Sequence, residues 1–224
     1  MENKSNICSP LGVRGSSFFT FSFDEVAPTF DEILDFIQST DLEEEHPAVV
    51  FIREILEELN FDTGISGGFI IKDVQQLLLK EGLLKIEDTT LDIGRQVCGY
   101  IKEATQVALF LCTAGEDFTR LTNQLNEQGD IMEAYILDAI GSLTVEKAMD
   151  KIQEHLKAEM SVSDLKISNR YSPGYCNWPL YDQKPLFELI GVNPTGIQLN
   201  AYRDWETKLS KEAVSEAAKR FYNK

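Results

Sequence analysis

The chain has 224 residues, of which 43% are hydrophobic and 10% aromatic, which is typical of a globular protein that buries a continuous core. Its 37 acidic and 21 basic residues give a net charge of −16, which repels phosphate backbones and argues against nucleic-acid binding. Four widely spaced cysteines and two histidines argue against a zinc ribbon, a disulfide framework or a histidine-rich metal site. No apolar run fits a signal peptide or a membrane span, so we expect a cytoplasmic protein without a membrane partner.

The N-terminal region begins with polar residues and then acquires regular patterns. Residues 1–16 are expected to form a loose terminus, and residues 17–224 a single domain. Aromatic residues at every second position over 17–23 predict a strand. Thr29 and Glu32 then form a capping-box pattern ahead of several apolar residues, which predicts the start of a helix.

The next hundred residues alternate between helix and strand signals. Pro47 suits the first turn of a helix that runs to about residue 60. The glycine-rich stretch 64–68 predicts a break, followed by a short apolar strand over 69–74. Lys85 and Ile86 indicate another strand, ahead of a helix near 91–101.

The C-terminal half contains the strongest patterns. Residues 105–113 form a nearly continuous apolar run, which predicts a strand buried on both faces. A long helix is expected over 131–159, a strand over 166–170, and helices over 182–190 and 206–222. Strands and helices do not alternate regularly, so we expect an α+β fold with an antiparallel or mixed twisted sheet flanked by helices.

The segment from Arg170 to Pro179 predicts a rigid loop rather than a regular element. Pro173 and Pro179 each fix a φ angle, and Gly174 permits a positive one. An arginine and three aromatic residues on such a loop suit a flat or anionic ligand, because a guanidinium can grip a carboxylate with two hydrogen bonds. The alternative is a proline-rich structural corner whose aromatic side chains belong to the core.

The same loop carries an Arg-x-x-x-Gly-Tyr motif at Arg170, Gly174 and Tyr175. It resembles the S-adenosylmethionine-binding motif of the reactivation domain of cobalamin-dependent methionine synthase. A second block, in the right order, is similar to the same family: a strand ending in Thr-Ala-Gly at 113–115, then Asp-Ala-Ile-Gly-Ser at 138–142 in the long helix. Residues 195–199 are similar to a later strand of the family, and beyond them the resemblance ends.

The resemblance implies roles for particular residues. Arg170 would hold the carboxylate of S-adenosylmethionine, and Tyr175 would line the site near the corrin or the sulfonium. Gly174 would let the backbone approach the ligand, with Ser172 beside it in the motif. Glu146 would supply negative charge towards the ligand's cations; the alternative is a solvated carboxylate on the flank of the helix. Gly141, inside that helix, indicates close packing.

The function that the resemblance implies is support of reductive methylation in trans. The cobalamin would be carried by a methionine synthase or another corrinoid protein, and a flavodoxin-like protein would supply the electron. No catalytic residue is expected on this chain, whose contribution would be to position S-adenosylmethionine. The alternative is a non-catalytic interaction module that kept the fold and corrinoid-protein docking but lost S-adenosylmethionine binding. A third possibility is a domain repurposed for an unrelated small ligand.

Overall fold

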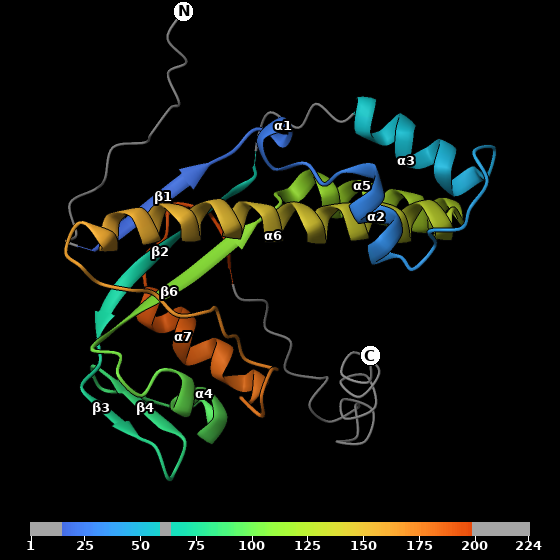
Figure 1. Cartoon of the computed structure of the whole chain (residues 1–224). Helices are drawn as coiled ribbons and strands as arrows, with labels where there is room; N and C mark the ends of the chain where they lie inside the picture. The colour runs from blue at the N-terminus through green and yellow to red at the C-terminus, as the bar shows by residue number, and fades with distance from the viewer. Residues whose placement is uncertain (1–14, 59–63, 199–224) are drawn as a thin grey trace, which may run out of the picture.

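The computed structural model describes residues 15–58 and 64–198, which form two small antiparallel sheets surrounded by helices (Figure 1). In the larger sheet the central strand, β2, pairs on one side with β1 and on the other with β6. The three strands are β1 (Ser16–Thr20), β2 (Ser66–Asp73) and β6 (Gln106–Thr113). They come from distant parts of the chain, so this sheet unites the N-terminal and middle regions.

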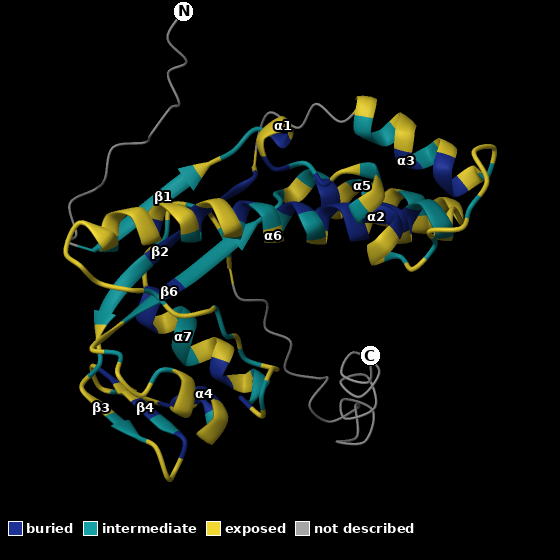
Figure 2. Ribbon diagram, viewed as in Figure 1, coloured by how far each residue is buried: buried dark blue, intermediate teal, exposed yellow. Residues whose placement is uncertain are grey.

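The longest helix, α6 (Ile131–Ser161), crosses one face of this sheet and continues well beyond its edge (Figure 1). Over the sheet, Ile152 and Leu156 are buried with Phe69 of β2. Beyond the sheet, the first half of α6 packs against four other helices. These are α1 (Phe23–Val26), α2 (Phe30–Phe36), α3 (Pro47–Glu58) and α5 (Glu116–Gln128). Helix α6 therefore joins two hydrophobic cores, and Figure 2 shows buried and exposed positions mixed along it.

A third core covers the opposite face of the larger sheet, where Leu109 of β6 is buried with Leu91, Trp178 and Ile190. It is built from the smaller sheet, one helix before β6 and two helices near the C-terminal end of the described chain. These elements are β3 (Gln76–Leu78), β4 (Leu83–Ile86), β5 (Thr89–Asp92), α4 (Gly94–Tyr100), the 3-10 helix η1 (Leu180–Asp182) and α7 (Gln183–Ile190).

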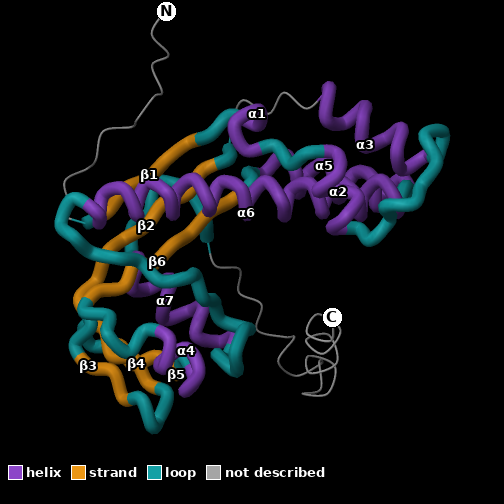
Figure 3. Tube along the Cα trace, viewed as in Figure 1, coloured by secondary structure: helices purple, strands orange, loops and turns teal. Residues whose placement is uncertain are grey.

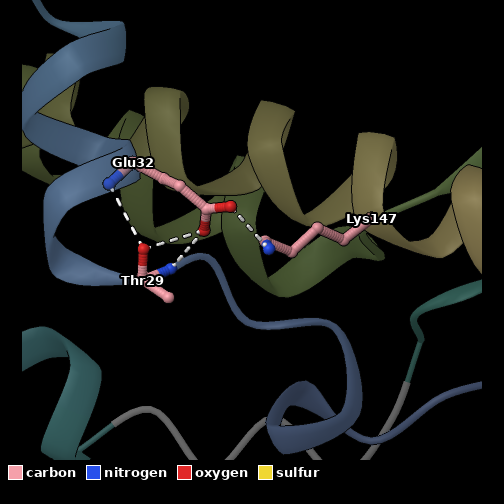
Figure 4. A network of polar contacts seen from close by, with 3 residues as sticks. All are labelled: Thr29, Glu32 and Lys147. Carbon is pink, nitrogen blue, oxygen red and sulfur yellow. Dashed lines mark hydrogen bonds and ion pairs between the residues drawn. The ribbon is translucent and has the colours of Figure 1, made fainter.

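The capping box predicted at the start of α2 is confirmed. The Glu32 backbone N–H donates to Thr29 Oγ1 at 3.3 Å, and the Thr29 N–H donates to Glu32 Oε2 at 2.7 Å (Figure 4). The other oxygen of this carboxylate accepts a 2.8 Å hydrogen bond from Lys147 of α6. Lys147 above all, and then the Thr29 N–H, lower the pKa of Glu32 to about 2. The capping residue Glu32 therefore also attaches α2 to α6.

The strand predicted over 69–74 is confirmed as β2, but the break predicted over 64–68 is confined to residues 64–65 because β2 already begins at Ser66. A Cβ atom at Gly67 would lie 2.8 Å from both the carbonyl oxygen of Leu111 in β6 and Ile152 Cδ1 of α6, so glycine is required where β2 meets its neighbouring strand and helix. The close packing predicted at Gly141 is confirmed. Its neighbour is the ring of Phe118 on α5, which a Cβ atom would approach to 3.2 Å.

Several predicted elements are confirmed with shifted ends. The strand over 105–113 and the helix over 131–159 appear as β6 and α6, and the short helix over 182–190 as η1 and α7. Strand β1 ends at Thr20 because Phe23 already belongs to α1. Helix α4 is shorter than expected, since Leu91 is part of β5. Only Leu109 of β6 is fully buried, so neither face of that strand is closed along its whole length.

The strand predicted over 166–170 is wrong, and the α+β sheet is antiparallel without it. This segment has no regular structure, and Figure 3 shows it as part of the loop between α6 and η1. Only Ile167 and Arg170 in it are partly covered, so there is no alternating apolar face to bury. Residues 195–198 likewise form no strand. The predicted helix over 206–222 lies outside the described residues. The expected loose terminus over 1–16 also lies outside them, apart from residues 15 and 16, and Ser16 already belongs to β1.

Candidate functional site

The loop after Arg170 is held by three backbone hydrogen bonds. The N–H of Tyr175 donates to the carbonyl of Ser172 at 3.2 Å, and that of Trp178 to the carbonyl of Tyr175 at 2.8 Å. The N–H of Gly174 donates to the carbonyl of Trp178 at 2.8 Å, which closes the turn. Gly174 has a φ of +99°, and Cys176 has a φ of +52°. The rigid loop predicted from its prolines and glycine is therefore present.

A buried carboxylate fixes this loop to the smaller sheet. Asp182 is 4% exposed, and its Oδ2 atom accepts from the indole N–H of Trp178 and from the backbone N–H of Asp92, each at 2.9 Å. Trp178 is itself buried among the residues of the third core. The aromatic residues of the loop thus divide, because Trp178 is part of the core while Tyr175 is 58% exposed.

The side chain of Arg170 reaches from the loop to helix α6. Its Nη1 donates to Gln153 Oε1 at 2.7 Å, and its Nη2 donates to Asp150 Oδ1 at 2.8 Å and to Glu146 Oε2 at 3.2 Å. The three partners are four and three residues apart, so they share one face of the helix. The two carboxylate side chains remain 70% and 67% exposed, whereas that of Arg170 is 25% exposed.

Loop and helix enclose an open cleft of about 1130 Å³ beside β6. Arg170, Ser172, Tyr175 and Glu146 all line it, as the sequence reasoning expected of one site. Strand β6 and helix α4 supply the apolar part of the wall, with residues such as Leu109 and Val97. Gly174 does not line the cleft. Its positive φ shapes the turn behind Tyr175, and a Cβ atom there would meet only Leu180 Cδ1, at 3.5 Å.

Sequence reasoning missed several residues that the structure brings to Arg170 or to the wall of this cleft. Gln153 is a partner of Arg170, and Asp150 is a closer partner than Glu146. The spacing of Glu146, Asp150 and Gln153 on the long helix was the available signal. Tyr100 and Tyr171 also line the cleft with stacked rings, and no local pattern connects these two positions.

The cleft can bind a ligand with both positive and negative groups, and its described residues do not suggest a metal. No group of three or more His, Cys, Asp or Glu side chains within residues 15–58 and 64–198 is arranged to hold an ion. Cys112 of β6 lies within the field of Glu146 and Arg170, and burial is the main cause that raises the pKa of its thiol to about 12. This thiol is therefore protonated and unreactive near neutral pH.

Comparisons with known proteins assign no function to this cleft. No model of a protein family matches this sequence, and a search of curated proteins finds no significant relative. In the part of the chain that the structure describes, no helix is both long and apolar enough to cross a membrane.

Proposed function

We propose that this chain binds S-adenosylmethionine in the cleft, like the methionine synthase reactivation domain that it resembles, and that as a separate chain it presents this ligand to a corrinoid protein in trans. The observation that carries the proposal is that Arg170, Tyr175 and Glu146, chosen from sequence motifs, line one cleft. Glu146 comes from helix α6 and the other two from a separate loop, so the motifs alone did not require them to meet.

The ion pairs around Arg170 fit an amino-acid ligand. An ion pair between exposed side chains contributes about 0–1 kcal/mol, so exchanging its partners costs little. A ligand carboxylate can take over the guanidinium of Arg170 with two parallel hydrogen bonds. The carboxylates thereby released, Asp150 and Glu146, can then accept the ligand's ammonium group or face its sulfonium. The exchange leaves no charge without a partner.

The remaining residues would orient the methyl group rather than react with it. The exposed ring of Tyr175 offers a face to the sulfonium, since cations bind over aromatic rings. When bound, S-adenosylmethionine supplies the methyl group for cobalamin on the partner protein, and a flavodoxin-like donor supplies the electron. Positioning alone can account for much of the rate of such a transfer. Such a partnership requires the cytoplasmic location expected from the sequence.

Titration calorimetry with S-adenosylmethionine tests this proposal. Arg170→Ala should weaken binding about tenfold to a hundredfold, because a hydrogen bond to a charged group contributes about 1.5–3 kcal/mol. Arg170→Lys should lose less, because lysine keeps the charge without the planar fork. Arg120→Ala is a matched control, since Arg120 is paired with Asp117 on α5 and does not line the cleft. Failure of the folded wild-type protein to bind would overturn the proposal.

The second candidate is an interaction module that docks a corrinoid protein without binding S-adenosylmethionine. The observation that favours it is that Arg170 already has three protein partners. Sedimentation of the chain with cobalamin-loaded methionine synthase, with and without S-adenosylmethionine, separates the two functions. A complex that forms equally well in both conditions, together with no calorimetric signal from the isolated chain, would favour the module.

A further inference from the structure

Two stacked tyrosines form part of the cleft wall. Tyr100 is the last residue of α4 and Tyr171 follows Arg170 in the loop, and both line the cleft. Their ring centroids are 5.5 Å apart and their planes differ by 13°. The hydroxyl of Tyr100 also accepts a 2.9 Å hydrogen bond from Gln96 Nε2, one helical turn earlier. Tyr100 is therefore held on one face by Tyr171 and at its tip by Gln96.

Tyr100 is the one aromatic residue of α4, and it lies on the exposed side of this helix. Val97 and Cys98 of α4 are buried in the third core, whereas Tyr100 is 56% exposed. Packing in the core explains why α4 carries Val97 and Cys98. It does not explain Tyr100, whose ring stacks on Tyr171 while more than half of its surface is exposed. Because Tyr171 packs against one face of the ring in an offset stack, a ligand would stack on the opposite face.

The position of this open ring face matches the rest of the proposed site. Tyr171 is adjacent to Arg170, and neighbouring Cα atoms are about 3.8 Å apart. Arg170 and Tyr100 both line the cleft, so one elongated ligand can contact the guanidinium at one end and the tyrosine stack at the other. A charged amino-acid group suits the first position. A flat, weakly polar ring suits the second, because aromatic rings stack favourably on purine bases.

We propose that the open face of Tyr100 is the stacking platform for the adenine ring of an adenosyl ligand whose amino-acid end contacts Arg170. The inference rests on the proposed function and adds a position for the nucleoside half of the ligand. Tyr171 supports the platform from behind and Gln96 restricts the rotation of the Tyr100 ring. Little side-chain freedom is then lost when a base stacks on it.

Three probes separate this inference from the proposed function: S-adenosylmethionine, adenosine and methionine, each titrated by ligand-observed NMR. Tyr100→Leu should weaken adenosine and S-adenosylmethionine about tenfold and leave methionine unchanged, since one stacked base is lost. Tyr100→Phe should stay within about twofold of wild type, because it keeps the ring. Arg170→Ala should weaken methionine and S-adenosylmethionine but not adenosine. Tyr135→Leu is the matched control, because Tyr135 is equally exposed, at 56%, and does not line the cleft.

The outcomes distinguish the two claims. If Tyr100→Leu binds S-adenosylmethionine and adenosine as well as wild type does, the platform is wrong while the proposed function stands. If wild type binds adenosine in a Tyr100-dependent manner but binds neither methionine nor S-adenosylmethionine, the platform is supported and the proposed function fails. Binding of none of the three probes by folded protein overturns both. Thermal unfolding of each variant identifies any that has lost its fold.

Discussion

Replacing Glu32 by glutamine tests whether the ion pair with Lys147 stabilises the attachment of α2 to α6. Glutamine can still complete the capping box with Thr29, so the substitution removes the charge and keeps the cap. The full difference between a pKa of 4.5 and about 2 corresponds to roughly 3 kcal/mol. The Glu32 and Lys147 side chains are 44% and 32% exposed, and solvent screening reduces this to about 1 kcal/mol. Urea unfolding at pH 7 should show that loss.

The pH dependence provides the stricter test. Because folding lowers the pKa of Glu32, its contribution is complete above pH 4.5 and disappears as the pH falls towards 2. The gap between wild type and Glu32→Gln should therefore shrink by more than half between pH 7 and pH 3. Glu25→Gln is the control, since Glu25 also bonds to its helix cap, at Ser22, but has no ion pair among the described residues. A gap that stays constant from pH 7 to pH 3 would refute the reasoning.

Three further substitutions and one labelling experiment have definite expectations. Gly141→Val should destabilise the fold by about 2 kcal/mol, because the added side chain would collide with the Phe118 ring. Gly99→Ala should stabilise the fold by about 0.5–1 kcal/mol, because the added methyl group meets open space on helix α4. Urea unfolding measures both changes. Asp182→Ala should cost about 2–4 kcal/mol in the same assay, since the buried indole N–H of Trp178 and the N–H of Asp92 lose their acceptor. Cys112 should resist iodoacetamide at pH 8 in the native protein and react in urea, as mass spectrometry of the labelled peptide can show.

The features that sequence reasoning predicted correctly depend on neighbouring residues. The capping box needs only Thr29 and Glu32, three positions apart, and α6 follows from apolar residues at helical spacing. The turn after Arg170 follows likewise from the fixed φ of Pro173 and the positive φ available to Gly174. Each of these structures is determined by contacts within a few residues.

The features that were missed depend on contacts between distant segments. The strand predicted over 166–170 is wrong because its residues, exposed except for Ile167 and Arg170, offer no apolar face to bury against β6. Gly67 reads locally as a breaker, and only its close contacts with Leu111 of β6 and Ile152 of α6 explain its place within a strand. The pairing of Arg170 with Asp150 and Gln153, and the stacking of Tyr100 on Tyr171, arise only when helix and loop are packed together.

The distribution of charge separates the cleft from the acidic part of the surface. Residues 23–58 carry twelve acidic and one basic side chain, and residues 114–140 carry six acidic and one basic. These segments form the helices around the first half of α6, whereas the cleft lies beside its second half. Residues 141–198, which supply every charged residue lining the cleft except Glu103, carry seven acidic and six basic side chains. Salt screens exposed charges beyond about 8 Å, so the acidic helices exert little field in the cleft. A ligand with charges of both signs therefore meets locally balanced partners there.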